Sequence, residues 1–287
     1  MNIDQLKTIA VIGAGTMGSG IAQVCAQAGY HTLLYDTNPA MLGKAKDQIK
    51  QQLQKAIDKQ LISAADRDSI LSHLHFTDRF TQLVADLCIE AIIEKLEPKV
   101  QLFRELESQN GKNCILATNT SSIPVTSIAA GCSRPSRVVG MHFFNPAHIM
   151  KLIEVISGVD TEVEVAQLVY DLSLKLGKKP VHAKDAPGFI VNRVARHYYV
   201  ESLKLLEEGV ADLETIDRLL ESRGFKLGPF RLMDLIGVDT NFAVTSSMFS
   251  SFQYDPKFRP SRIQQQKVDA GHHGRKSGKG FYDYPTT

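Results

Sequence analysis

One histidine of this sequence has the type and surroundings to transfer a proton. His142 lies in an apolar stretch, residues 140–155, and the carboxylate of Glu154 follows twelve residues later. Histidine has the side-chain pKa nearest neutrality, so it can take and return a proton at physiological pH. A buried carboxylate needs a cationic or hydrogen-bonding partner. The pair is therefore a candidate base with its orienting group, and a core histidine bonded to a backbone carbonyl is an equal alternative.

A glycine-rich turn suggests where a cofactor binds. The segment Gly13-Ala-Gly-Thr-Met-Gly18 follows an apolar run and opens a helical one. Gly13 permits a tight turn, Gly15 lets a pyrophosphate approach the backbone, and Gly18 lets helix and strand pack closely. Thr16 and Met17 begin the helix, whose N–H groups and dipole favour phosphate. We expect a dinucleotide site here, and a glycine turn without a ligand is the alternative.

Asp36 ends the second apolar run, eighteen residues after Gly18. A carboxylate at this place accepts hydrogen bonds from the adenosine ribose and repels a 2′-phosphate. The sequence therefore predicts NAD rather than NADP as the cofactor. Tighter binding of NADP in a direct titration would contradict this prediction.

A hydroxyl group is expected at the same edge of the sheet as His142. Ser121 follows the apolar run 114–117, and ligands of this fold class bind beyond the carboxyl ends of the strands. Ser121, His142 and Glu154 could also form a hydrolase triad. However, the GxSxG turn that exposes a nucleophilic serine is missing, and a bound dinucleotide favours hydride transfer. A helix cap before Pro124 is a further alternative for Ser121.

Strand and helix signals alternate over the first 184 residues. The apolar runs are mostly continuous, which is typical of strands that helices cover on both faces. Strands are expected at 8–12, 31–35, 87–91, 114–117, 137–143, 152–156 and 180–183, with helices at 17–28, 39–60, 98–107 and 162–176. This order predicts an α/β fold of the Rossmann type with a doubly wound, mainly parallel sheet.

Helical spacing from 39 to 73 interrupts the alternation and predicts a helical insertion, in the form of a hairpin that projects from the sheet. Lysines lie along it at Lys44, Lys46, Lys50, Lys55 and Lys59. Their charge alone favours a solvated helix face over a binding surface.

The pattern changes at Asp185-Ala-Pro-Gly188, because proline and glycine together interrupt regular structure. Beyond it, helices are expected at 189–208, 213–222, 232–249 and 260–270. We therefore expect an NAD-binding domain over residues 1–184 and an all-α domain over 185–287 for substrate binding and dimerisation. The helix at 189–208 is apolar on most faces, which predicts burial inside the domain or against the second subunit of a homodimer.

Composition excludes several classes of partner and site. The chain has 287 residues, and its formal net charge of +2 argues against nucleic acid as a partner. Its four cysteines lack metal-ligand spacing, so we expect reduced thiols in a cytoplasmic protein, and no metal site. We expect no membrane segment and no signal peptide. The glycine-rich segment 274–280 lacks the residue order of a phosphate loop.

Seven blocks resemble, in order and spacing, the L-3-hydroxyacyl-CoA dehydrogenase family. They are GAGTMGSGIAQ, EAIIEKLEPK, NTSS, GMHFFNPAHIMKLIEV, APGFIVNR, LGPF..MDLIG.D and GRKSGKGFYDY, and they span essentially the whole chain. Two further segments, VNRVAR and NFAVT, are similar to the bacterial 3-hydroxybutyryl-CoA and phenylacetate-pathway members.

The resemblance implies a role for each matching residue. His142 would be the general base in oxidation and the acid in reduction, and Glu154 would hold its ring and stabilise the imidazolium. Ser121 and Asn192 would bind the substrate, Ser121 through the C3 oxygen and beside the nicotinamide. The residues implied near the cofactor are Glu94, Lys99, Asn145 and Lys276, and the residue implied near coenzyme A is Lys59. A structural ion partner is the alternative for Glu154, and an inter-domain hydrogen bond is the alternative for Asn192.

Four positions depart from the family pattern. Gln52 replaces a serine near the coenzyme A, which puts those contacts in question. Ala147-His148 replaces a proline-rich pair, and His272-His273 replaces an apolar pair. Arg231 replaces an acidic residue, with consequences for a salt bridge of the helical domain or for acyl preference.

We therefore expect an NAD-dependent L-3-hydroxyacyl-CoA dehydrogenase that acts reversibly on short acyl chains. Oxidising a secondary alcohol removes a hydride and a proton, and the cofactor takes only the hydride, so the protein must take the proton. The alternatives are a dehydrogenase of free hydroxy acids, a catalytically silent NAD-binding relative, and an acyl-CoA hydrolase. The sequence does not fix acyl length, a preference for a terminal carboxylate, or the pathway.

Overall fold

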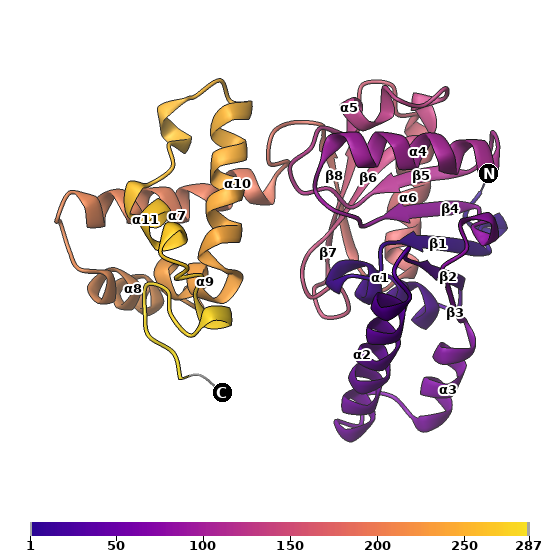
Figure 1. The fold of residues 1–287 in the computed structure, drawn as a ribbon, viewed down its shortest axis with the longest axis horizontal. Helices are drawn as coiled ribbons and strands as arrows, with labels where there is room; N and C mark the ends of the chain where they lie inside the picture. The colour runs from indigo at the N-terminus through magenta and orange to yellow at the C-terminus, as the bar shows by residue number, and fades with distance from the viewer. Residues whose placement is uncertain (1, 286–287) are drawn as a thin grey trace. The chain divides into compact units, whose positions relative to one another are not determined.

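The computed structural model describes residues 2–285 and divides the chain into two compact units (Figure 1). The division falls between Ala186 and Pro187, two residues beyond the expected boundary at 184. Each unit has a hydrophobic core of its own, which supports treating the two as separate domains.

An eight-stranded sheet forms the centre of the first unit, in the order β3-β2-β1-β4-β5-β6-β7-β8. Its strands are β1 (Thr8–Ile12), β2 (His31–Tyr35), β3 (Leu74–Thr77), β4 (Leu87–Glu90), β5 (Ile115–Thr118), β6 (Val138–Phe143), β7 (Leu152–Ser157) and β8 (Lys179–Lys184). Neighbouring strands are parallel, except that β6 and β7 are antiparallel. The predicted doubly wound, mainly parallel sheet is confirmed.

Six α-helices accompany this sheet: α1 (Thr16–Gln27), α2 (Pro39–Asp58), α3 (Ala64–Ser72), α4 (Leu96–Asn110), α5 (Val125–Ala129) and α6 (Val163–Lys175). The helices α2 and α3 form the expected hairpin insertion, and α3 begins at a capping box of Ser63 and Asp66 (Figure 1). The strand β3 directly after the hairpin was not predicted from the sequence. Its four residues, Leu-His-Phe-Thr, form an edge strand with only two buried side chains, so they show no continuous apolar run.

Alternation along the strands decides which side chains reach which face of the sheet. Met141 and Phe143 of β6, with Ile153 of β7, belong to the core that includes α1 and α6. Because successive side chains of a strand point to opposite faces, His142 and Glu154 face the other side. That is the side on which α4 and α5 pack against each other and against β5 and β6.

The second unit consists of α7 (Val191–Glu207), α8 (Leu213–Ser222), α9 (Pro229–Ile236), α10 (Val238–Ser251) and α11 (Arg262–Asp269). Its core includes Tyr199 and Leu203 of α7 with Phe230 and Met233 of α9. The prediction of one helix over 232–249 was wrong. Gly237 has φ +106, outside the helical region, and therefore ends α9 before α10 begins.

The helix α7 is buried on one side only within a single chain. Val200 and Leu203 are buried, whereas Val194 is 70% exposed. The prediction of burial nearly all round therefore fails for the isolated chain. Burial of the outer face against a second subunit stays a prediction.

The glycine-rich segment 274–280 has a structural role around Asp234. The buried Asp234 carboxylate accepts hydrogen bonds from the backbone N–H groups of Phe281 and Tyr282, at 2.9 and 3.0 Å. A Cβ on Gly274 would overlap the carbonyl oxygen of Asp234, and one on Gly280 would overlap its carboxylate. Close packing around Asp234 thus accounts for both glycines, in agreement with the rejection of a phosphate loop.

We predict that Gly274→Ala destabilises the protein more than Gly271→Ala. Both residues have positive φ, +92 and +72, and Gly274 combines it with ψ −148, a region that is essentially restricted to glycine, so backbone strain costs each variant about 1–3 kcal/mol. An added methyl meets no atom within 4 Å at Gly271 but collides with the Asp234 backbone at Gly274, which adds about 1–3 kcal/mol. Unfolding in urea, followed by circular dichroism, measures both losses. Equal losses would show that the collision relaxes at no cost.

Candidate functional site

The glycine turn lies where the strand order of the sheet reverses. From β1 the chain proceeds outward to β2 and β3, and then returns to β4 on the other side of β1. In open α/β sheets this switch point opens a crevice at the carboxyl ends of the strands. Gly13 has φ +104, and a Cβ there would lie 2.6 Å from the carbonyl oxygen of Ala91, just after β4. A Cβ on Gly18 would overlap the carbonyl oxygen of Gly13. Protein packing therefore demands glycine at both positions.

Gly15 has no such packing reason to be glycine. No protein atom lies within 4 Å of the position that its Cβ would take. Gly15 is also the N-cap of α1 and makes no side-chain capping bond to the helix, so Thr16 and Met17 begin a helix whose terminus lacks a capping side chain. Open space beside a helix N-terminus suits a pyrophosphate, which backbone N–H groups and the helix dipole stabilise.

The carboxylate of Asp36 is fixed beside this turn. Its Oδ2 accepts the N–H of Ala14 at 2.8 Å, and its Oδ1 accepts the N–H of Asn38 at 2.9 Å. A carboxylate oxygen has two lone pairs, so both oxygens can accept further hydrogen bonds. Asp36 thus stands where the hydroxyls of an adenosine ribose would find an acceptor. The residues at this crevice fit a dinucleotide without a 2′-phosphate.

His142 and Glu154 are direct cross-strand partners. The antiparallel register of β6 and β7 pairs the two residues, and His142 Nδ1 lies 2.7 Å from Glu154 Oε2. The side chains are 6% and 0% exposed. The ring of Phe144 lies next to the imidazole, with centroids 4.5 Å apart. The Nδ1 atom therefore bonds to a carboxylate, which disfavours the simple core-histidine interpretation.

Glu94 holds the loop that carries Ser121. Its Oε1 accepts hydrogen bonds from Thr120 Oγ1 at 2.6 Å, from Ser121 N at 2.8 Å and from Ser122 N at 3.1 Å. Burial alone would raise the pKa of Glu94, but the Lys99 ammonium and the bonds from Thr120 and Ser121 outweigh burial and hold that pKa below its ordinary value. Glu94 is therefore ionised at neutral pH, and it orders this loop.

The loop is also tied to the strand of His142. Asn119 Oδ1 accepts the N–H of Phe143 at 2.8 Å, across the carboxyl ends of β5 and β6. The cap proposed as an alternative for Ser121 is absent, because α5 begins at Val125 with Pro124 as its N-cap residue. Sequence reasoning gave Asn119 no role. Its place directly after a strand, in the same loop as Ser121, was the available signal.

A buried ion pair supports this edge of the sheet from below. Lys99 of α4 is 1% exposed, and its Nζ bonds to Glu90 Oε1 and lies 3.2 Å from Glu94 Oε2. Glu90 Oε2 accepts a further bond from Thr118 Oγ1 at 2.8 Å. The ammonium of Lys99 therefore lies between two carboxylates. Lys99 therefore stabilises the Glu94 carboxylate, and Glu94 in turn orders the Ser121 loop.

The remaining predicted residues lie elsewhere. Asn145 is exposed in the loop between β6 and β7. In the second unit, Asn192 lies in the first turn of α7, and Lys276 Nζ bonds to the Asp239 carboxylate at 2.7 Å. Arg231 does enter a salt bridge of that unit, because its Nε lies 3.9 Å from the carboxylates of both Asp217 and Glu221.

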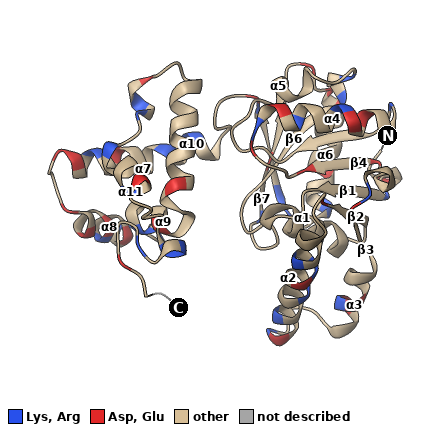
Figure 2. Ribbon diagram, in the orientation of Figure 1, with Lys and Arg blue, Asp and Glu red and all other residues tan. Residues whose placement is uncertain are grey.

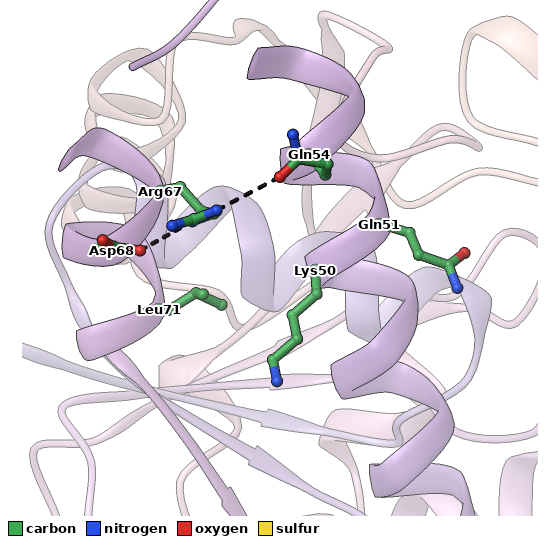
Figure 3. A pocket seen from close by; sticks show the side chains of 6 residues that line it. All are labelled: Lys50, Gln51, Gln54, Arg67, Asp68 and Leu71. Carbon is green, nitrogen blue, oxygen red and sulfur yellow. Dashed lines mark hydrogen bonds and ion pairs between the residues drawn. The ribbon is translucent and has the colours of Figure 1, made fainter. Parts of the chain in front are cut away.

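The helical hairpin carries a groove of about 440 Å³ between α2 and α3. Arg67 bonds to Asp68 at 2.8 Å and to Gln54 at 3.4 Å, and Lys50 lines the opposite wall (Figure 3). Basic and acidic side chains are interleaved along α2 (Figure 2). Lys59 follows Lys50 by nine residues, or two and a half helical turns, so it lies on the other side of α2. The groove and Lys59 are therefore separate features.

Within residues 2–285, no group of three or more His, Cys, Asp or Glu side chains is arranged to hold a metal ion. No helix in this part of the chain has the length and apolar character to cross a membrane.

Comparison with known proteins gives a consistent result over the whole chain. Residues 8–186 match the family model for the NAD-binding domain of 3-hydroxyacyl-CoA dehydrogenase, and residues 188–284 match its C-terminal domain. The 3-hydroxyadipyl-CoA dehydrogenase of Escherichia coli is 47% identical over 97% of this chain, which spans 59% of that protein. A probable 3-hydroxybutyryl-CoA dehydrogenase of Bacillus subtilis is 40% identical over 98% of both chains.

A solved structure agrees with these sequence relatives. The (S)-3-hydroxybutyryl-CoA dehydrogenase of Ralstonia eutropha superposes with a TM-score of 0.95 at 38% identity, and the match covers 98% of this chain and 100% of that one.

We predict that Lys99→Met destabilises the protein by about 3–5 kcal/mol, because it leaves the Glu90 carboxylate buried without its cation. Lys95→Met is the matched control, since Lys95 is exposed at the start of the same helix and its loss should change stability by at most about 0.5 kcal/mol. Adding Glu90→Gln to Lys99→Met should recover much of the loss. Urea unfolding measures all three variants, and equal losses in the two single variants would contradict the prediction.

Proposed function

This chain is an NAD-dependent member of the 3-hydroxyacyl-CoA dehydrogenase family, and we propose that it interconverts short-chain L-3-hydroxyacyl-CoA and 3-ketoacyl-CoA with His142 as its general base. The buried bond of 2.7 Å between His142 and Glu154 carries the proposal. It lies at the carboxyl edge of a sheet whose switch point fits a dinucleotide, so proton transfer and hydride transfer would take place at one edge.

The proposed proton path uses one atom of the histidine. With Nδ1 donating to Glu154, the ring presents Nε2 to the hydroxyl on C3 of the substrate. When bound, NAD supplies the acceptor for the hydride from C3. His142 takes the hydroxyl proton, and the Glu154 carboxylate stabilises the imidazolium that forms. In the reverse direction His142 returns the proton to the carbonyl oxygen.

Ser121 and Asn192 would bind the substrate, with the Ser121 hydroxyl donating to the C3 oxygen beside the nicotinamide. The bonds from Glu94 and Asn119 support this role, because they fix the Ser121 loop relative to the strand of His142. A fixed donor stabilises charge on an oxygen without having to reorganise during the reaction.

The proposed cofactor contacts lie along the crevice at the carboxyl ends of the strands. The glycine turn would hold the pyrophosphate, and Asp36 would hold the adenosine ribose. Glu94 and Asn145 would lie near the nicotinamide end, with Lys99 acting through Glu94. The resemblance to the family is the ground for proposing Lys276 as a further cofactor contact.

The acyl-CoA substrate is that of the family, and we propose the helical hairpin as the place where its coenzyme A lies. Lys59 is exposed at the C-terminus of α2 and can approach a phosphate. Gln52 is seven residues earlier on the same side of the helix, so the exchange of a family serine for glutamine at this place would change contacts to the coenzyme.

We further propose a homodimer formed by the second unit, in a cytoplasmic protein. Val194, exposed on α7, supports the dimer because an apolar face gains stability when a partner covers it. The four cysteines are all unpaired, which suits a reducing compartment.

We predict NADH oxidation by this protein with 3-ketoacyl-CoA substrates, with kcat/KM highest for acetoacetyl-CoA and falling as the acyl chain lengthens. A 3-ketoadipyl-CoA arm tests for a terminal-carboxylate preference, and free acetoacetate tests the alternative of a free hydroxy acid. Faster turnover of the free acid than of the thioester would overturn the proposed function. Thiol release without NAD would point to a hydrolase, and NADH binding without any turnover to a silent relative.

We predict that His142→Gln lowers kcat by about 10²- to 10⁴-fold, the usual loss on removing a general base. Glutamine can still donate a hydrogen bond to Glu154, so the fold and the NADH dissociation constant should change little. Steady-state rates and NADH fluorescence titration measure the two effects separately. A near-normal kcat would remove His142 from the mechanism.

A further inference from the structure

Lys178 is a buried cation that the reaction does not use. It lies between α6 and β8 and is 6% exposed. Within residues 2–285 it has no carboxylate partner. Its ammonium donates instead to two backbone carbonyl oxygens, those of Ala147 at 2.5 Å and Met150 at 2.9 Å. A buried charge without a counter-ion is costly and needs an account.

Both acceptors belong to one loop, residues 144–151, which joins β6 to β7. The loop follows His142 directly, leads to Glu154, and carries Asn145. Inside the loop, Pro146 O accepts the N–H groups of Ile149 and Met150, at 3.0 and 2.9 Å. These bonds shape one turn of the loop but do not attach it to the rest of the domain.

The loop also contacts α1, the helix that follows the glycine turn. Ala147 is buried, and its Cβ lies 3.2 Å from the place where Gly20 of α1 would carry a Cβ. The ammonium of Lys178 also lies close enough to the buried Cys25 thiol of α1 to influence its pKa. The loop thus contacts both Lys178 and the helix of the dinucleotide site.

We propose that Lys178 is a positioning residue for the cofactor: its two bonds hold the 144–151 loop against α1, so that Asn145 and Phe144 are fixed where the nicotinamide end of NAD is recognised. The inference rests on the proposed function. The last residue of the loop is tied to β8 independently, because Lys151 O accepts the N–H of Lys179 at 2.7 Å. Without the Lys178 bonds, residues 144–150 would have to be ordered when NADH binds, and the cofactor would bind more weakly.

The charge on Lys178 should make this effect depend on pH. Burial and the nearby Lys151 lower the pKa of Lys178 to about 8, while Cys25 acts in the opposite direction. His148, the other titratable group of the loop, has its own pKa lowered by burial and by Lys178. Below pH 8 the ammonium therefore makes charge-assisted bonds, and above it the neutral amine makes weaker ones.

The test compares Lys178→Met with Lys179→Met, an exposed neighbour with the same change of side chain. We expect Lys178→Met to raise the KM and dissociation constant for NADH about tenfold and to lower kcat at saturating NADH less than threefold. In the wild type the NADH dissociation constant should rise as pH passes 8, and this rise should vanish in Lys178→Met. Lys179→Met should match the wild type in both respects.

A merely structural role would reduce the folded fraction and hence kcat, and would leave the NADH dissociation constant unchanged. That result would overturn the inference while the proposed function stands. Failure of the wild type to bind NADH would overturn the proposed function itself.

If Lys178→Met does not fold, Gly20→Ala tests whether the position of the 144–151 loop controls NADH binding. The added methyl presses on Ala147 from the α1 side and should raise the NADH dissociation constant severalfold, whereas Gly43→Ala, with open space around it, should not. If both Lys178→Met and Gly20→Ala fold, their effects should combine to less than their product, because both act through one loop. An unchanged dissociation constant in Gly20→Ala would overturn the inference.

Discussion

Ionised groups withdrawn from water must be paired, and this constraint shapes the carboxyl edge of the sheet. Glu90 and Glu154 are fully buried at this edge, whereas Glu94 is 36% exposed, and each is bonded to a residue of another segment. Taking a carboxylate out of water costs several kcal/mol unless such partners are present. The same bonds that satisfy the charges therefore fix the Ser121 loop and orient His142. Stability and the geometry of the candidate site have one physical origin here.

The reversal of direction at β7 is what brings the histidine and its carboxylate together. Had β7 been parallel to β6, a crossover of a dozen or more residues would have separated the two strands. The antiparallel pair needs only the loop 144–151, and its register places Glu154 directly opposite His142. The loop 144–151 that joins the two strands makes few hydrogen bonds to the rest of the domain. Lys178, which belongs to neither strand, donates one of them to Ala147.

The sequence predicted those elements whose signal is a short local motif or a regular spacing of apolar residues. Continuous apolar runs located seven of the eight strands, and the glycine turn and Asp36 followed from spacing. It failed where the deciding contact comes from another element. The strand β3 is defined by its pairing with β2, and the helix break at Gly237 by one backbone angle. The roles of Asn119 and Lys178 depend on hydrogen-bond partners 24 to 31 residues away. No window of sequence contains those partners.

The two glycine-rich segments show why composition alone cannot separate a ligand site from a packing site. Gly13, Gly18, Gly274 and Gly280 all lie where a Cβ would strike protein atoms, so packing within the chain explains them. Within these two segments, Gly15 has open space in place of a Cβ and no positive φ to require glycine. Gly43 inside α2 shares both properties, so open space points to a ligand at Gly15 only because Gly15 also lies at a helix N-terminus directly after a strand. By this criterion the turn after β1 is the candidate binding site, and Gly274 and Gly280 serve the packing around Asp234.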